Sequence, residues 1–470
     1  MPLILPSNSI SGGYEVANSL RFDNDSSDYL SRTQSSGNRK TLTISFWVKR
    51  SGITDRQSLN SCTVDGSNET FIWFDTDDTL FVKNSTSTTD FELRTSRLFR
   101  DVSAWYHIVV AIDTTQGTSS NRVKIYVNGV QETSFANETY PSLNFDTRWN
   151  ENAKTINIGR EEYNAEYYDG YMAEVVLIDG SQLDATSFGE FDSDSGIWKP
   201  IDVSGLTFGT NGFYLDFENS GSLGADVSGN GNNFTVNNLT AIDQSTDTCT
   251  NNFATWNPLK SWNRSGTIQT ASFDNGNLRA IFDDANYNEH AWSTIGINTG
   301  KWFCEMKAED ITATSNTRIG IADIEYTGTA NPGDQSSTIY YMGNGQKRVG
   351  GTNSSYGASY ANGDIIGIYM DLEDMKSYWS KNGSLMNSGT GIDLTALASN
   401  GTGHYMFYVG DNNSAAQTCE ANFGNGFQAL SSAVTDDNGY GSFEYSPNIT
   451  GDGTAKSFYS CCTKNLAEFG

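Results

Sequence analysis

Hydrophobic and polar residues alternate with a period of two along many short stretches of this chain. In NRVKIYVNGV, the apolar residues Val123, Ile125 and Val127 are separated by more polar ones, as in a strand that buries one face and exposes the other. Asn128-Gly129 follows immediately, and both residue types accept the positive φ that a tight hairpin turn requires. The stretch therefore predicts a β-hairpin.

The same pattern recurs in KSYWSKNGSL, residues 376–385, where Asn382-Gly383 ends a second strand-like run. Similar runs bounded by turn residues follow one another along the chain, among them TLTISFWVKR, FIWFDTDDTLFVK, WYHIVVAID, KWFCEMK and IIGIYMDLE. Short strands at regular spacing indicate antiparallel β-sandwiches. We therefore expect an all-β protein.

The composition agrees with this prediction. The chain has 470 residues, with 46 Gly, 12% aromatic residues and only 29 Lys plus Arg, which is not typical of a helical protein. At roughly 100–200 residues per domain, this length predicts two large domains, and each is long enough to bury a full core.

A strong negative charge restricts the classes of partner. The formal net charge is -27 and the sequence pI is about 4.3, so nucleic acid phosphates and anionic membranes would be repelled. No apolar run reaches the roughly eighteen residues of a membrane span, so we expect no membrane insertion. The opening MPLILPSNSISGG lacks the positive n-region and long apolar h-region of a secretory signal, and we interpret it as a docking arm.

The six cysteines, at 62, 249, 304, 419, 461 and 462, lack the CxxC spacing and paired histidines of a zinc site. Cys304 and Cys419 lie within strand-like runs, where cysteine acts as a small apolar residue. The adjacent pair Cys461-Cys462 has no explanation in the sequence.

The first half of the chain resembles a known family. SLRFDNDSSDYL, TISFWVKRSG, WYHIVVAIDTTQG, VKIYVNG and INIGR…YDGYMAEVVLID occur in this order. They are similar to the successive strands of a laminin-G-like domain of the concanavalin A-like lectin/glucanase type. The resemblance covers most of residues 15–190, and it is specific for the fold and not for the ligand.

The second half resembles a different family. A GKW motif leads into a strand, and a Gly-Asp pair precedes IIGIYMDLE and the YWSKNG hairpin. Together these motifs resemble a SPRY (B30.2-type) domain over about residues 265–428. The two resemblances imply two concanavalin-like antiparallel β-sandwich (jelly-roll) domains in tandem.

The order of the parts resembles virion structural proteins of tailed bacteriophages. A laminin-G-like domain, a DVSGNGNNFTVNN segment, a SPRY domain and a CTKNL motif follow one another as in those proteins. The expected division is an N-terminal arm for particle attachment at 1–15, a first sandwich at 16–200, a Gly/Asn-rich junction packed between the domains at 201–262, a second sandwich at 263–430 and a C-terminal tail at 431–470.

This resemblance implies a location on the virion surface, other virion proteins as partners, and assembly as a homo-oligomer. The function that it favours is a non-enzymatic tail fibre or receptor-binding appendage that recognises a host-surface glycan or protein. One alternative is a capsid decoration or vertex protein. The other is a glycan depolymerase.

A depolymerase would need two carboxylates that face one another across a cleft. Asp216 with Glu218, and Asp323 with Glu325, have same-face spacing on a strand. In so acidic a chain such pairs are expected without any function, so they do not by themselves indicate catalysis.

A catalytic triad would need a histidine within hydrogen-bond reach of its partners. The histidines are His107, His290 and His404, and His107 lies inside the strand-like run WYHIVV. P-loop, dinucleotide-binding and HExxH motifs are absent from the sequence. We therefore expect no catalytic residue, no organic cofactor and no enzymatic activity.

One acidic segment suggests a metal. DNDSSD places Asp23, Asp25 and Asp28 close together, and carboxylate oxygens suit calcium. The segment lacks the Gly and terminal Glu of an EF-hand, and a polar turn between two strands explains it as well. Calcium at these three residues is the one metal site that the sequence suggests.

Tyrosines in loops are candidate ligand contacts, because a tyrosine combines apolar area with a polar group. SPRY domains generally bind partners through loops at one end of the sandwich, which nominates Tyr356 and Tyr360. The alternative is that many of these rings simply cover the sandwich edges. The candidates are Tyr163, Tyr167 and Tyr168 in the first domain and Tyr340, Tyr341, Tyr356 and Tyr360 in the second.

Overall fold

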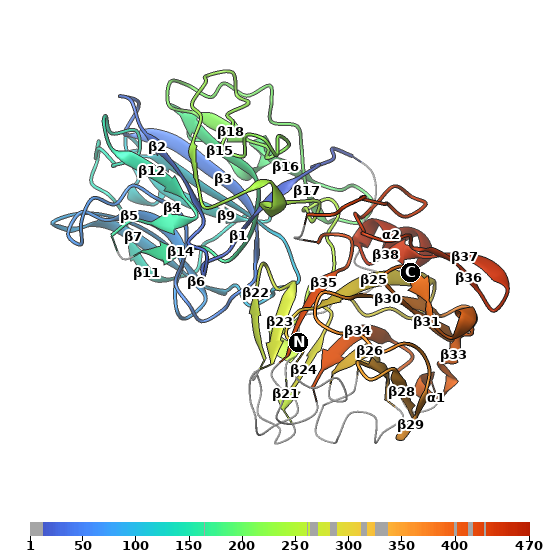
Figure 1. Ribbon diagram of the computed structural model, residues 1–470. Helices are drawn as coiled ribbons and strands as arrows, with labels where there is room; N and C mark the ends of the chain where they lie inside the picture. The colour runs from blue at the N-terminus through green and yellow to red at the C-terminus, as the bar shows by residue number, and fades with distance from the viewer. Residues whose placement is uncertain are drawn as a thin grey trace. The chain divides into compact units, whose positions relative to one another are not determined.

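The structure is a computed structural model that describes residues 13–163, 165–260, 262–263, 271–282, 289–311, 317–324, 337–398, 402–411, 417–426 and 429–470. The chain forms two compact units, one over Gly12–Thr250 and the other including Asn251–Gly470. Both are built almost entirely of antiparallel strands (Figure 1), which confirms the all-β prediction. Residues 1–12 of the expected N-terminal arm lie outside the described residues.

The first domain is a sandwich of two sheets, called I and II. Sheet I has the strand order β10-β9-β8-β3-β15-β1-β20, with β18 paired to β15, and sheet II has the order β11-β7-β6-β5-β4-β12-β2-β19. The strands of sheet I are β1 (Ser19–Phe22), β3 (Thr41–Arg50), β8 (Tyr106–Asp113), β9 (Val123–Val127), β10 (Val130–Gln131), β15 (Gly170–Asp179), β18 (Phe213–Leu215) and β20 (Gln244–Ser245). The strands of sheet II are β2 (Tyr29–Thr33), β4 (Gln57–Ser61), β5 (Thr70–Phe74), β6 (Thr79–Thr86), β7 (Thr88–Leu98), β11 (Phe135–Thr139), β12 (Thr155–Ile158) and β19 (Thr235–Asn237).

The core of the first domain lies between these two sheets. Ile44 and Phe46 of β3, and Ile72 and Phe74 of β5, are fully buried in one hydrophobic cluster. Residues between them point to the other face of their sheet, as the period of two predicts. Burying one such side chain stabilises the fold by about 1.5–3 kcal/mol.

Residues 201–250 belong to the first compact unit and pack along the first sandwich. β18 pairs with β15, β19 with β2, and β20 with β1. The large apolar residues of this segment, Phe208, Phe213, Tyr214, Leu215 and Phe217, are all buried against the first sandwich. The segment therefore completes sheets I and II.

A buried ion pair connects residues 201–250 to β3 of sheet I. Lys49 Nζ lies 2.8 Å from Asp247 Oδ2, and the two side chains are 1% and 0% exposed. The indole N–H of Trp105 donates to Asp247 Oδ1 at 3.1 Å, and the Ser19 hydroxyl donates to the Asp247 carbonyl at 2.6 Å. Because a buried charge that loses its partner is strongly destabilising, the segment is integral to the domain.

The second domain is also a sandwich, of sheets III and IV. Sheet III has the order β21-β24-β34-β26-β27-β28-β29, and sheet IV has the order β22-β23-β35-β25-β30-β31-β32, with β33 paired to β31 and β38 paired to β25. The strands of sheet III are β21 (Trp262–Asn263), β24 (Glu289–Trp292), β26 (Arg318–Asp323), β27 (Thr338–Met342), β28 (Gln346–Val349), β29 (Thr352–Ser355) and β34 (Tyr405–Gly410). The strands of sheet IV are β22 (Ser272–Asp274), β23 (Arg279–Phe282), β25 (Lys301–Ala308), β30 (Ile365–Asp371), β31 (Lys376–Lys381), β32 (Ser384–Leu385), β33 (Ile392–Asp393), β35 (Gln417–Asn422) and β38 (Tyr459–Ser460).

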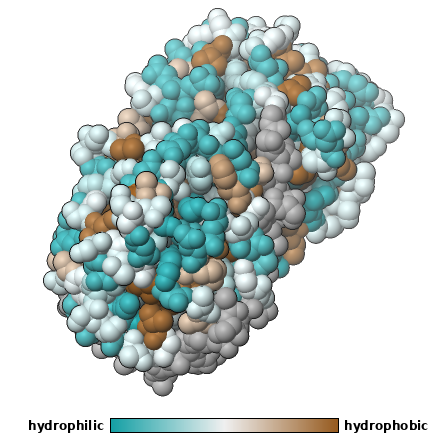
Figure 2. Space-filling view, turned by 90° about the vertical axis from the view of Figure 1, so that its right-hand side faces the viewer, coloured by the Kyte–Doolittle hydropathy of each residue, from teal (hydrophilic) through white to brown (hydrophobic). Residues whose placement is uncertain are grey.

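Few elements lie outside the four sheets. The short hairpins are β13 (Arg160–Glu161) with β14 (Glu166–Tyr167), β16 (Gly189–Phe191) with β17 (Trp198–Pro200), and β36 (Asn448–Gly451) with β37 (Thr454–Ser457). The α-helices are α1 (Thr395–Ala398) and α2 (Thr463–Phe469), and 3-10 helices occur at Ser119–Asn121, Ala185–Ser187, Ala241–Asp243, Pro258–Lys260 and Met386–Gly389. Within the described part of the chain, no helix is long and apolar enough to cross a bilayer. Hydrophilic residues cover most of the side shown in Figure 2, and apolar residues there are scattered.

Both predicted hairpins are present. Asn128-Gly129 joins β9 to β10 with φ values of 48° and 80°, and Asn382-Gly383 joins β31 to β32 with φ values of 47° and 76°. Positive φ at both central residues is the geometry whose twist matches antiparallel strands. The two domains therefore use the same turn chemistry in different sandwiches.

The C-terminal tail packs on the outer face of sheet IV, a placement that the sequence did not indicate. Phe303 of β25 lies opposite Tyr369 of β30, and Tyr369 lies opposite Tyr378 of β31. These rings point away from the domain core and form a cluster with Phe443 and Phe458 of the tail. The tail therefore covers an aromatic face that would otherwise be exposed.

A buried carboxylate also holds the tail. Glu305 of β25 accepts hydrogen bonds from the backbone N–H groups of Glu444, at 2.9 Å, and Tyr445, at 2.7 Å. The amide of Asn422 donates to the same side chain at 3.1 Å. Burial raises the pKa of Glu305 from its ordinary value to about 7, although these hydrogen bonds act in the opposite direction.

Glu305 makes stability depend on pH. Because its pKa is higher in the folded protein than in the unfolded chain, the folded state binds the proton more tightly. Its contribution to the free energy of unfolding is therefore full below the ordinary glutamate pKa and is lost as pH rises to about 7. We expect the stability of the wild type relative to Glu305→Gln to fall over this range, as measured by denaturant titration at a series of pH values. A pH-independent difference would contradict this assignment.

Candidate functional site

The β13–β14 hairpin projects from the end of β12 and carries two of the predicted tyrosines. Gly159 starts the hairpin with a φ of +81°, and a Cβ at this position would lie 2.7 Å from the ring of Phe22. Only glycine combines this backbone conformation with such a close approach at low cost. The sequence IGR therefore sets the direction in which the hairpin leaves the sheet.

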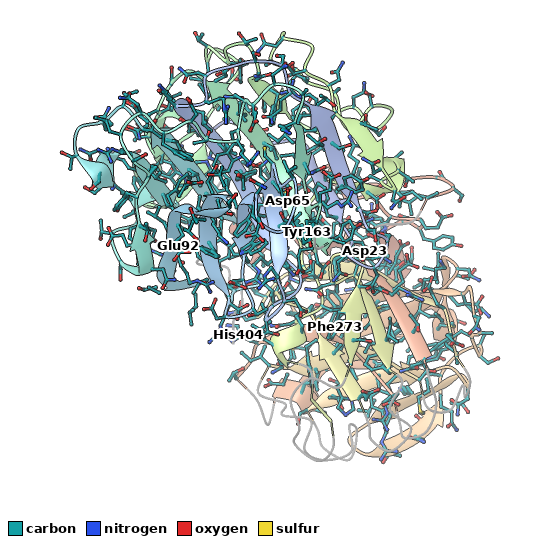
Figure 3. All side chains as sticks on the ribbon, turned by 90° about the vertical axis from the view of Figure 1, so that its left-hand side faces the viewer. Asp23, Asp65, Glu92, Tyr163, Phe273 and His404 are labelled. Carbon is teal, nitrogen blue, oxygen red and sulfur yellow. The ribbon has the colours of Figure 1, made fainter. Side chains whose placement is uncertain are left out.

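Tyr163 lies in the turn of this hairpin and is the most exposed of the predicted tyrosines. Its side chain is 59% exposed. A Cβ on Gly66, in the loop between β4 and β5, would lie 2.8 Å from the Tyr163 ring, so the ring rests on the backbone of that loop. Figure 3 shows Tyr163 beside Asp65 of the same loop. The ring lies against this loop and remains open to solvent.

A guanidinium group organises the base of the hairpin. The Arg160 guanidinium carbon lies 4.6 Å from the ring centre of Tyr29 and 5.6 Å from that of Tyr167. Both rings are partly buried, and their centroids are 6.2 Å apart. Cation–π contacts of this kind contribute about 0.5–1 kcal/mol at exposed positions, so Arg160 orders the two rings without burying them.

An aromatic row lies next to this hairpin on the outer face of sheet II. Phe71 and Trp73 of β5 are stacked at 3.4 Å with an interplanar angle of 14°, and Phe81 of β6 lies opposite Trp73. Arg56 lies 4.6 Å over Trp73, and Arg94 lies 4.4 Å over Phe81. The alternation that places Ile72 in the core places these three rings on the other face.

The arginines above the aromatic row are held by carboxylates. Arg56 pairs with Glu166 of the hairpin at 3.3 Å and with Asp75 at 3.2 Å. Arg94 pairs with Asp75 at 2.5 Å and with Asp77 at 3.2 Å. The rings beneath are buried, whereas Arg56 is 34% exposed and Arg94 is 22% exposed. The outer face therefore offers tyrosine rings at one end and paired guanidinium groups along its length.

Five of the predicted tyrosines are buried, which corrects the expectation that they are exposed loop residues. Tyr168 is 0% exposed and its hydroxyl donates to the Lys49 carbonyl at 2.9 Å. In the second domain, Tyr341, Tyr356 and Tyr360 belong to the main hydrophobic core. The exposures in that domain are 2% for Tyr340, 0% for Tyr341, 6% for Tyr356 and 1% for Tyr360. Rings at these positions support the sandwiches and do not meet a ligand at the surface.

The three predicted calcium ligands form a hydrogen-bonded turn between β1 and β2. The backbone N–H of Asp23 donates to Asp28 Oδ2 at 3.1 Å, and that of Asp25 donates to Asp23 Oδ1 at 3.0 Å. Burial raises the pKa of Asp28 to about 6, which disfavours the charged form that calcium requires. In the part of the chain that the structure describes, no three His, Cys, Asp or Glu side chains are grouped to hold a metal ion.

His107 is placed so that it cannot activate its hydroxyl neighbour. The indole N–H of Trp198 donates to His107 Nδ1 at 3.0 Å, so the proton of the neutral ring is on Nε2, which faces the Ser45 hydroxyl at 2.9 Å. Nε2 is therefore a donor and not a base toward Ser45. The ring is fully buried, and this burial lowers its pKa to about 3.

The other candidates for catalysis that the structure describes do not form a reactive pair. His290 is buried, with Nδ1 2.8 Å from the hydroxyl of Tyr408, and His404 is half-buried at the start of β34. Asp216 Oδ1 accepts the backbone N–H of Glu218 at 3.2 Å, as in a local turn. Asp323 is buried in β26, and Glu325 lies outside the described residues.

Comparisons with protein families agree with the two sandwich domains seen in the structure. Residues 24–185 match the family model of the concanavalin A-like lectin/glucanases superfamily, and residues 301–425 match that of the SPRY domain. The chain carries a concanavalin A-like domain followed by a SPRY domain. The lectin-like character of the first domain suggests a binding function, although the superfamily is named for glucanases as well as lectins.

The individual relatives each match about a third of this chain. The E3 ubiquitin-protein ligase RKP of Arabidopsis thaliana is 27% identical over 166 residues, which cover 33% of this chain and 12% of that ligase. The chain thus spans a small part of that relative. Among solved structures, the SPRY domain of human HERC1 is 15% identical with a TM-score of 0.29 and covers 35% of this chain and 96% of its own. A heptameric SAP-like pentraxin from Limulus polyphemus is 16% identical with a TM-score of 0.27 and covers 36% of this chain and 80% of its own.

The base of the hairpin contains two residues that the sequence did not single out. Tyr29 and Arg160 are far apart in the chain, and β12 brings them together because it pairs with β2. The sequence pattern that could have indicated Tyr29 is the alternation in β2, which places Tyr29 and Leu30 on opposite faces of the sheet. The sequence alone did not show that Arg160 would lie across that strand.

Proposed function

We propose that this protein is a non-enzymatic binding protein of a tailed-phage virion, located on the tail, and that its first domain binds a host-surface glycan. The observation that carries the glycan assignment is the exposed Tyr163 ring in the turn of the hairpin whose base holds Arg160 against the rings of Tyr29 and Tyr167. A sugar ring has an apolar C–H face and a rim of hydroxyls. An aromatic face next to a guanidinium group complements both.

Two further observations support the proposal. The first domain matches a superfamily that includes lectins. The ordered sequence motifs, including DVSGNGNNFTVNN and CTKNL, resemble those of virion proteins of tailed phages and support the location. The negative charge of the chain favours a neutral or basic glycan over an acidic one.

Removal of the exposed ring should weaken glycan binding. We expect Tyr163→Ala to lower the affinity for purified host-surface polysaccharide roughly tenfold, because one stacking contact is lost. Tyr163→Phe should retain most of the affinity, since the ring is kept. The measurement is biolayer interferometry of the full chain on immobilised polysaccharide.

The matched control is Phe191→Ala. Phe191 is 53% exposed on β16, outside the tyrosine hairpin, so its removal tests whether any exposed ring matters. Equal affinities for the wild type and Tyr163→Ala would count against this face as the binding site. Absence of binding by the wild type would count against glycan recognition itself.

The virion location has a separate test. Cryo-electron microscopy of intact particles, with antibody labelling, locates and counts the chain. Density on the tail with a threefold, sixfold or twelvefold copy number would support the proposal and an oligomer of that symmetry. Density on the capsid would instead support a decoration or vertex protein, and absence from the particle would refute a virion role.

A further inference from the structure

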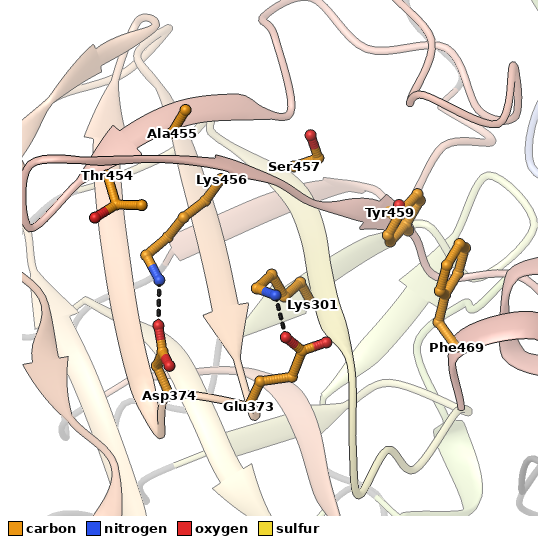
Figure 4. Close-up of a pocket in the computed structure, with 9 residues that line it drawn as sticks. All are labelled: Lys301, Glu373, Asp374, Thr454, Ala455, Lys456, Ser457, Tyr459 and Phe469. Carbon is orange, nitrogen blue, oxygen red and sulfur yellow. Dashed lines mark hydrogen bonds and ion pairs between the residues drawn. The ribbon is translucent and has the colours of Figure 1, made fainter.

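A pocket of about 350 Å³ lies where the tail meets sheet IV, within the second domain (Figure 4). Three parts of the chain form it. Lys301 comes from the start of β25, and Glu373 and Asp374 come from the turn between β30 and β31. Lys456, Tyr459 and Phe469 come from β37, β38 and α2 of the tail. Because the tail provides one wall, a SPRY sandwich without the tail would not contain this pocket.

Two ion pairs line the pocket. Lys301 pairs with Glu373, and Lys456 Nζ lies 2.5 Å from Asp374 Oδ2. Lys456 also pairs at 2.8 Å with Asp371, which is fully buried. Each ammonium group thus already has a carboxylate partner, so an anionic ligand would gain no unpaired positive charge. The three carboxylates carry one charge more than the two ammonium groups, so the pocket does not favour an anion.

The ion pairs nevertheless leave hydrogen-bonding groups available. Glu373 is 56% exposed and Asp374 is 62% exposed, so carboxylate oxygens remain accessible beside ammonium donors. The Thr454 hydroxyl adds a group that donates and accepts, and the Ser457 hydroxyl, which is hydrogen-bonded to Asp437, can still accept. Fixed donors next to fixed acceptors suit a ligand with adjacent hydroxyls.

An aromatic pair forms one end of the pocket. The rings of Tyr459 and Phe469 are stacked, with centroids 3.9 Å apart and an interplanar angle of 12°. Figure 4 shows both rings at the same end, next to Lys301 and Glu373. The stack restrains both rings and provides an apolar surface adjoining the polar groups.

We propose that this pocket binds one uncharged sugar unit, with an apolar face of the sugar against the Tyr459–Phe469 pair and its hydroxyls at the two ion pairs. The combination of ion-paired polar groups, hydroxyls and an aromatic surface favours a neutral polyhydroxylated ring over a phosphate or a carboxylate. The volume is in the range of small-molecule pockets. The site is built from residues other than the face of sheet II and does not depend on the function proposed for that face.

The test uses ligand-observed saturation-transfer NMR on the full chain. The probes are glucose, galactose, mannose and N-acetylglucosamine at millimolar concentration, with N-acetylneuraminic acid and glucosamine as charged counterparts. We expect saturation transfer to at least one neutral sugar and a roughly tenfold loss of affinity in Glu373→Ala, because a charged hydrogen-bond partner is removed. Phe469→Ala should cause a comparable loss, since the Tyr459 ring loses its support.

Glu190→Ala in the first domain is the matched control. Glu190 is 59% exposed and pairs with Lys199 at 3.4 Å, so the same kind of change is made away from the pocket. Should Phe469→Ala fail to fold, Glu373→Ala in its exposed turn still decides the question. Binding that disappears in the pocket variants and persists in Glu190→Ala and Tyr163→Ala supports the proposal. Binding of the charged probes alone, unchanged binding in Glu373→Ala, or saturation transfer to none of the neutral sugars overturns it.

Discussion

Phe458→Ala will destabilise the second domain by about 3–5 kcal/mol, the usual cost of truncating a fully buried phenylalanine. Phe458 is 0% exposed and contacts the rings of Tyr369 and Tyr378 at centroid distances of 5.3 Å and 6.4 Å. The variant leaves a cavity between the tail and sheet IV. Hydrogen-exchange mass spectrometry should show faster exchange in peptides from β25 and β30, by two orders of magnitude or more where exchange requires the domain to unfold.

Phe191→Ala makes the same chemical change at an exposed position and should alter stability by less than about 0.5 kcal/mol. Peptides of the first domain should keep their wild-type protection in Phe458→Ala, because Phe458 belongs to the other compact unit. A Phe458→Ala protein with wild-type exchange in β25 would show that the tail is not part of the cooperative unit.

Lys49→Met will destabilise the first domain by about 3–5 kcal/mol, since it leaves the buried Asp247 carboxylate without its cation. Both side chains are buried, at 1% and 0% exposure. The expected result is a lower midpoint of denaturant unfolding and faster hydrogen exchange in β3 and β15. Peptides of the second domain should exchange at the wild-type rate if the destabilisation is confined to the first domain.

The double variant Lys49→Met with Asp247→Asn separates two contributions to the loss of stability. One is the lost attraction between Lys49 and Asp247, and the other is the cost of burying an unpaired carboxylate. The asparagine keeps the size of the side chain and can still accept from the Trp105 indole, which donates to Asp247 at 3.1 Å. We expect it to recover at least half of the lost stability, because no buried charge remains. A double variant less stable than Lys49→Met would mean that the pair itself, and not the isolated carboxylate, determines the cost.

The fold was predictable where the chain repeats a simple physical pattern. Val123, Ile125 and Val127 are buried at alternate positions and Asn128-Gly129 reverses the chain, as expected. The same alternation predicted other strands of which the two sandwiches are built. The packing of the tail on sheet IV was not predictable. The sequence around an outward-facing residue such as Phe303 shows the same alternation whether its ring contacts solvent or another segment.

The candidate site was only partly predictable, because tyrosine suits both surface and core. Tyr163 is exposed as expected, whereas Tyr168 and Tyr341 are buried with hydroxyls that donate to the backbone carbonyls of Lys49 and Ala358. A backbone acceptor satisfies the phenol and removes the cost of burial. Such partners come from other strands, so the sequence near each tyrosine does not reveal them.

The pairing of β1 with β20 brings the two ends of the first domain together. Ser19 lies opposite Ser245, and the backbone N–H of Val16 donates to the Thr250 hydroxyl at 3.1 Å. A domain whose chain enters and leaves at neighbouring points can be inserted or replaced with little disturbance to its surroundings. Replacement of the first domain by another sandwich whose ends also meet would therefore need no rerouting of the adjoining chain.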